Sequence, residues 1–204
     1  LNLNSGSFDM RDMFSSCSTI DINHLNLNSG SFDMRDMFSS CSNININHLN
    51  LESGSFDMIN VFSSCSNINI NDFQMDVNSN TFDMRSIFSS CININIKYFK
   101  MEGNSNTFNM RGIYWRTGNK KKAITIIIIK GTNNRIDMKN LYSYYETVDT
   151  FFNFPILNFN LSNSQIYMDG MFENCQKLKF INLSNNINQI SILNKLNFIR
   201  YLLF

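Results

Sequence analysis

The chain has 204 residues, of which 43% are hydrophobic, and a formal net charge of +1. This apolar content can support a buried core, and the near-neutral charge gives no electrostatic basis for binding nucleic acid, which requires a basic stripe. The longest apolar run, 124–129, is far shorter than the roughly 18 residues of a membrane-spanning helix, so the sequence predicts no membrane span.

A short phrase recurs seven times along the chain: an apolar residue, two residues of any kind, then two adjacent apolar residues. It occupies 10–14, 34–38, 58–62, 84–88, 110–114, 138–142 and 168–172, and its final aromatic residues are 24, 24, 26, 26, 28 and 30 residues apart. Residues 1–24 and 25–48 differ at only two positions, 19/43 and 21/45, which indicates recent duplication. Periods of about 20 to 50 residues are typical of solenoids.

The first predicted element of each unit is a helix of two turns. In the second unit the apolar residues have the i, i+3, i+4, i+7 spacing of a helix face; they are Met34, Met37, Phe38 and Cys41. Asp33 is the expected N-cap, and Asp36 three residues later completes an arrangement like a capping box. Phe32 and Met37 have the spacing of a hydrophobic staple.

The second predicted element is a strand, because the apolar residues then alternate at period two. In the second unit these residues are Ile44, Ile46, Leu49 and Leu51, and Ser53-Gly54-Ser55 forms a turn into the next unit. A unit of this size cannot enclose a core alone, so neighbouring units must stack. The sequence predicts an α/β repeat: a right-handed solenoid of about seven coils, each with one short helix and one short strand in a parallel sheet along one side.

The order Met-x-x-Met-Phe-x-x-Cys followed by a strand pattern, at 34–51 and again at 168–184, resembles the BspA-like leucine-rich repeat proteins. Leu178-x-x-Ile181-x-Leu183-x-x-Asn186 is also similar to the general leucine-rich repeat pattern. The resemblance implies a leucine-rich-repeat-like solenoid divided into regular repeats at 1–114, a divergent or inserted segment at 115–137, and degenerate repeats at 138–204. In the early units the strand begins two residues further from the Cys than this pattern has it.

The cysteines and histidines are expected to be structural or solvent-exposed rather than catalytic. Four of the five cysteines recur once per unit and should form a buried column; they are Cys17, Cys41, Cys65 and Cys91. No Cys or His pair has the spacing of a metal site, and His24 and His48 occur in no nucleophile motif. We therefore expect no enzymatic activity, no metal and no cofactor.

The outward positions of the predicted strands change from unit to unit while the apolar positions stay nearly fixed. They are candidates for partner binding, although drift at solvent-exposed sites explains the same variation. The candidate residues are His24, Asn26, His48, Asn50, Asp72, Gln74, Tyr98 and Lys100, with a third column at Asn28, Glu52, Asp76 and Glu102. A column at Arg11, Arg35, Arg85 and Arg111 is expected to be a solvated face of the helices.

The expected function is non-catalytic recognition of a protein or another macromolecule. The BspA-like resemblance implies a cell-surface or secreted location, whereas five apparently unpaired cysteines favour a reducing compartment and leave an intracellular leucine-rich repeat scaffold as the alternative. Leu1 opens the chain inside a repeat unit, so we expect a fragment or a processed product.

Overall fold

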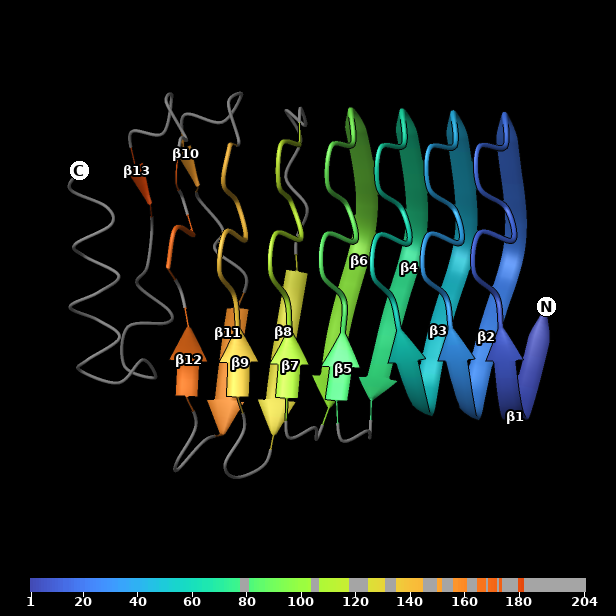
Figure 1. Cartoon of the computed structure of the whole chain (residues 1–204), viewed down its shortest axis with the longest axis horizontal. Coiled ribbons are helices and arrows are strands. Elements are labelled where there is room, and N and C mark those ends of the chain that lie inside the picture. Colours follow the sequence, from blue (N-terminus) through green and yellow to red (C-terminus); the bar gives the residue numbers. More distant parts are fainter. Residues whose placement is uncertain are drawn as a thin grey trace.

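The computed structural model describes residues 1–77, 81–103, 107–117, 125–130, 135–144, 150–151, 156–160, 165–167, 169–171, 173 and 180–181. Over these residues the chain winds into a solenoid of about five coils whose strands all pair in parallel (Figure 1). Much of the remainder of the predicted seven coils, including residues 168 and 172 of the 168–172 phrase, lies outside the described residues.

Each coil has two sides that face each other across the core. One side is built from long strands, which lie behind in Figure 1; they are β2 (Thr19–Asp33), β3 (Asn43–Asp57), β4 (Asn67–Val77), β6 (Asn93–Gly103), β8 (Thr125–Lys130) and β11 (Ile156–Asn160). The other side carries short strands in front; they are β5 (Thr81–Asp83), β7 (Thr107–Asn109), β9 (Arg135–Asp137) and β12 (Gln165–Tyr167). The ends of β1 (Asn2–Asp9), β2 and β3 bend round the lower corner to join this side.

The strands of both sides form one eleven-stranded sheet, in which equivalent residues of successive units are hydrogen-bonded neighbours. Two further strands, β10 (Thr150–Phe151) and β13 (Phe180–Ile181), form a separate parallel pair. Strand β8, from the segment predicted to be divergent or inserted, pairs with β6 from Phe99↔Thr125 to Gly103↔Ile129. The pairing therefore runs without a break from β1 to β11.

The period changes from 24 to 26 residues at one corner of the coil. Strand β3 pairs with β4 at an offset of 24 as far as Glu52↔Asp76, and after a register shift Gly54 pairs with Val77. It pairs with β5 at Asp57↔Asp83, at an offset of 26. The two additional residues thus enter between the two sides of the coil, where they leave the stacked strands in register. Insertions at corners are the usual way in which a solenoid varies its repeat length.

The predicted helices are wrong. No helix occurs in the part of the chain that the structure describes, and the Met-x-x-Met-Phe segments are successions of tight turns. Within one segment the amide of Met37 donates to the carbonyl of Met34 at 3.1 Å, which is an i to i+3 turn bond. Alternate amides bond to the next coil: Asp36 N donates to Ile59 O at 3.0 Å and Phe38 N donates to Val61 O at 2.9 Å.

Backbone geometry explains why the helical spacing gives turns here. The third residue of every phrase has a positive φ, as the third position of a type II turn requires, and this left-handed conformation cannot continue an α-helix. The residues in that column are Asp12, Asp36, Asn60, Ser86, Gly112, Asn140 and Gly170, with φ between 54° and 61°. All are types that favour turns, and Gly and Asn tolerate a positive φ most readily.

The predicted helix cap has a related role in these turns. The Oδ1 atom of Asp33 accepts a hydrogen bond from the backbone amide of Arg35 at 3.3 Å, so the carboxylate caps a turn instead of a helix. Asp36 is a left-handed turn residue and not the third residue of a capping box. Phe32 and Met37, the expected staple pair, are both buried.

The core consists of columns in which each side chain packs on its equivalent in the next coil. The largest column has ring centroids 5.3 to 5.6 Å apart. Its members are Phe14, Phe38, Phe62, Phe88, Tyr114 and Tyr142. A second column stacks Phe8, Phe32 and Phe56, and the inward residues of the long strands fill the space between.

A pair of substitutions at Ser86 distinguishes stacked turns from helices. Because Ser86 has φ +57°, we expect Ser86→Gly to preserve the free energy of unfolding or raise it by up to about 1 kcal/mol, and Ser86→Val to lower it by about 1–2 kcal/mol. In a helix Ser86→Gly would lower it by about 0.5 kcal/mol. Urea unfolding measures both, and a loss of stability with glycine would contradict the turn assignment.

The aromatic column predicts a large effect of truncation. Phe38 is fully buried and stacks on Phe14 and Phe62, so Phe38→Ala should lower the free energy of unfolding by about 3–5 kcal/mol. Asp33→Ala removes a turn cap and should cost about 1 kcal/mol. Equal losses for the two variants in urea unfolding would be inconsistent with this packing.

Candidate functional site

The eight candidate residues lie on the outer surface of four adjacent long strands, β2, β3, β4 and β6. Strand pairing places them in two columns, which we call the variable columns. The first runs His24, His48, Asp72, Tyr98 and the second runs Asn26, Asn50, Gln74, Lys100. The structure thus brings all eight side chains together, and their role in partner binding stays a prediction.

The alternation of the strands fixes which side chains face outward. Leu49 and Leu51 are buried in the core. Their neighbours face outward: His48 is exposed and Asn50 is partly exposed. In the same strand Asn47 and His48 are both exposed, and the strand pairing skips Asn47. Inward and outward positions are therefore exchanged by one residue at this point, as in a β-bulge.

The first variable column is organised by contacts between coils. The imidazole rings of His24 and His48 are stacked with centroids 4.7 Å apart and an interplanar angle of 7°. The Nδ1 atom of His48 lies 3.5 Å from Asp72 Oδ2, and the amide of Gln74 donates to the same oxygen at 2.8 Å. Asp72 therefore orients His48 and Gln74, while its Oδ1 atom is buried without a hydrogen-bond partner.

Two side chains of the second column bond to glutamates two residues further along their own strands. Lys100 Nζ lies 3.0 Å from Glu102 Oε1, and this hydrogen bond raises the pKa of the lysine. The amide of Asn50 donates to Glu52 Oε1 at 2.6 Å. Tyr98 is 40% exposed and carries the one phenol ring in the two columns.

Two shallow grooves cross this surface. One, of about 190 Å³, is lined by side chains of both columns from β2, β3 and β4, among them His24, His48 and Asp72. The other, of about 330 Å³, is lined mainly by asparagines of β1, β2 and β3. Asn26 and Asn50 line both grooves, so the two hollows adjoin.

Sequence reasoning missed a set of asparagine ladders on the same strands. In one ladder the amide of Asn69 donates to Asn45 Oδ1 at 3.2 Å and that of Asn95 donates to Asn69 at 3.1 Å. Two further ladders join Asn43, Asn67 and Asn93, and Asn23, Asn47 and Asn71, at 2.7 to 3.0 Å. The signal was present in the Asn-Ile-Asn-Ile-Asn runs, where an amide recurs at each outward position.

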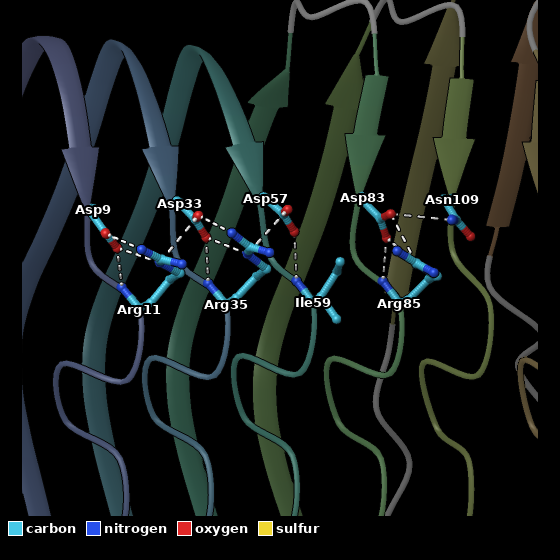
Figure 2. Close-up of polar contacts among 9 residues, drawn as sticks. All are labelled: Asp9, Arg11, Asp33, Arg35, Asp57, Ile59, Asp83, Arg85 and Asn109. Carbon is cyan, nitrogen blue, oxygen red and sulfur yellow. Dashed lines mark hydrogen bonds and ion pairs between the residues drawn. The ribbon is translucent and has the colours of Figure 1, made fainter.

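Three arginines of the arginine column, Arg11, Arg35 and Arg85, lie on the other side of the coil and are held by aspartates (Figure 2). Arg35 donates from Nε to Asp33 Oδ1 at 2.8 Å in its own coil and lies 3.6 Å from Asp57 Oδ2 in the next. Arg11 makes the equivalent contacts with Asp9 and Asp33, and its hydrogen bond lowers the pKa of Asp9 to about 2. The predicted solvated face is thus a partly exposed ladder of alternating charges.

The cysteine column donates hydrogen bonds to backbone carbonyls of the preceding coil. Cys41 Sγ donates to Phe14 O at 3.1 Å, and burial raises the pKa of this thiol. Cys65 and Cys91 make the same bond to Phe38 and Phe62, and the hydroxyl of Thr117 continues the pattern. The four cysteines in this column are free thiols, and Cys175 lies outside the described residues.

Over the described residues, no group of three or more His, Cys, Asp or Glu side chains is placed to hold a metal ion. In the same part of the chain no helix is long and apolar enough to cross a membrane. Comparison with protein-family models, curated proteins and solved structures gave no match.

One coil lacks the arginine of the charge ladder, and this predicts a change in the pKa of the neighbouring aspartate when an arginine is introduced. Ile59 occupies the arginine position beside Asp57, and burial raises the pKa of the Asp57 carboxyl (Figure 2). A carboxyl with a raised pKa favours the folded state at low pH, and this contribution is lost as the pH rises through the folded pKa. In Ile59→Arg we expect the pKa of Asp57 to fall below its usual value, as the pKa of Asp33 does beside Arg35.

NMR titration of the Asp57 side chain measures this shift, with Ile59→Leu as the apolar control. Asp57 in Ile59→Arg should then favour the folded state above its unfolded pKa and lose that contribution as the pH falls. An unchanged Asp57 pKa in Ile59→Arg would show that a guanidinium at this position does not bind the carboxylate.

Proposed function

We propose that the protein is a non-catalytic recognition module that binds another macromolecule through the variable columns. The observation that carries this proposal is a contrast within single strands. Along the strand pairing, one inward column stays apolar, with Leu51, Met75 and Met101. The adjacent outward column changes in chemistry, from histidine to Asp72 and Tyr98. A solenoid sheet of this kind offers an extended surface for a partner.

The family and the location belong to the same proposal. The Met-x-x-Met-Phe-x-x-Cys pattern supports a relationship to BspA-like leucine-rich repeat proteins, with a turn ladder in the place where a helix was expected. That relationship favours a cell-surface or secreted protein. Antibody labelling of intact and permeabilised cells tests the location, and labelling only after permeabilisation would exclude surface display.

An intracellular scaffold is the second candidate, and the free thiols favour it. Cys41, Cys65 and Cys91 are buried, unpaired and one coil apart, as expected for a protein in a reducing compartment. Their structural role as hydrogen-bond donors to backbone carbonyls is equally compatible with an exported protein, since thiols with this burial are poorly accessible to oxidants.

A double substitution tests the binding surface. Tyr98→Ala combined with Lys100→Ala should weaken partner binding at least tenfold, because it removes the exposed ring and the cation of the columns. The melting temperature should change little, because Tyr98 is exposed and an ion pair at the surface contributes about 0–1 kcal/mol. Surface plasmon resonance with immobilised matrix proteins and polysaccharides measures the affinity.

The matched control is Arg85→Ala combined with Arg111→Ala, in the stacked turn segments on the other side of the coil. Unchanged binding in the control is expected. Loss of binding in the arginine control alone would move the site to the turn side of the solenoid.

A further inference from the structure

The asparagine ladders leave part of each amide unused. A carboxamide has two N–H donors and an oxygen with two lone pairs, and a ladder bond uses one donor and one lone pair. Asn69 donates to Asn45 and accepts from Asn95, and its other N–H and lone pair remain unused on an exposed side chain. Asn47 is used in the same way between Asn23 and Asn71.

These unused groups are already oriented. The two ladder bonds of Asn69, 3.2 and 3.1 Å long, hold the amide plane, so a ligand that bonds to it orders no further side chain. The same donor and acceptor are repeated once per coil along the solenoid axis, because the strands pair in register. The surface therefore presents a regular row of neutral hydrogen-bonding groups.

The adjoining grooves extend this amide chemistry. Asn26 and Asn50 line both hollows, and Gln74 lines one of them. In the next coil Tyr98, 40% exposed, supplies a ring of the kind that packs against the C–H face of a sugar. Amide side chains beside an exposed aromatic ring suit a ligand that is rich in hydroxyl groups and also has apolar faces.

The charge of this surface favours a neutral ligand over a polyanion. The described outward side chains of this surface include several carboxylates, among them Glu52, Asp72 and Asp76, whereas Lys100 is paired with Glu102 at 3.0 Å. The arginines lie on the other side of the coil, where aspartates bind them. A nucleic acid or sulfated glycan would meet carboxylates on this face, while a neutral glycan would not be repelled.

We propose that the outer face of β2, β3, β4 and β6 binds a neutral polysaccharide, whose chain lies across the strands and along the solenoid axis. This inference rests on the proposed recognition function and names its ligand class. The hydroxyl groups of the chain bond to Asn50, Gln74 and the ladder nearest to them, Asn23, Asn47 and Asn71. One sugar ring packs on Tyr98.

Affinity electrophoresis tests the inference, with hydroxyethyl cellulose, mannan and dextran as neutral probes and heparin as the polyanionic probe. The intact chain should be retarded by at least one neutral polysaccharide and not by heparin. The variant Asn50→Ala/Gln74→Ala/Tyr98→Ala should lose this retardation at least tenfold, and the Arg85→Ala/Arg111→Ala control should retain it. Circular dichroism of both variants establishes that each is folded.

If Asn50→Ala/Gln74→Ala/Tyr98→Ala does not fold, Tyr98→Ala alone, at an exposed position, serves in its place. Retardation by heparin alone, by no polysaccharide, or equally for the folded variant and the intact chain would overturn the glycan inference. If matrix proteins bind in a manner that depends on Tyr98 and Lys100 while no neutral polysaccharide does, the recognition function stands and its ligand is a protein.

Discussion

The structure depends on hydrogen bonds that join equivalent residues of successive coils, both in the strands and through the turns. In a turn segment Asp36, Phe38 and Ser40 donate in sequence to the carbonyls of Ile59, Val61 and Ser63, at 2.8 to 3.0 Å. Because this pairing fixes the register, every side chain is placed on its equivalent in the next coil. The columns of phenylalanine, asparagine and cysteine are consequences of that constraint, since these side chains bond or pack favourably with copies of themselves. Stacked aspartates instead repel one another, and in most coils an arginine beside the aspartate offsets this repulsion between carboxylates.

The repeat, the parallel stacking and the register of the outward columns could be predicted from the sequence, because all three follow from apolar periodicity and from the length of the unit. The helix could not, since apolar residues at i, i+3, i+4 and i+7 also face inward when two tight turns follow each other. The column of Asp36, Asn60, Ser86 and Gly112 carried the contrary signal, as each of these residue types favours turns. The asparagine ladders were missed because an alternating Asn-Ile run was interpreted only as a strand with one buried face. The ladder bonds join neighbouring coils, so the sequence of one unit does not reveal them.

The same constraint links stability to recognition. The inward columns stay apolar because a polar group or a poor fit there would leave an unpaired group, a cavity or a clash in two interfaces at once. Outward positions have no such limit, so His48, Asp72 and Tyr98 can succeed one another in a single column. The asparagine ladders combine both roles, because their bonds join neighbouring coils and also orient the amide groups that remain unused. A binding surface of this kind needs no mobile loop, since the strand pairing itself places the ligand-binding groups.

The most direct test of this account is an NMR measurement on residues 84–91 and 110–117, whose sequences differ enough to resolve. Stacked turns predict nuclear Overhauser effects between residues 25 or 26 apart in these two segments, for example between the amide regions of Phe88 and Ile113, whose N and O atoms are 3.0 Å apart. They also predict slow amide exchange at Phe88 and a positive φ at Ser86 from three-bond couplings. A continuous series of i to i+3 effects with helical carbon shifts across 84–91, and no contact between the two segments, would contradict the account.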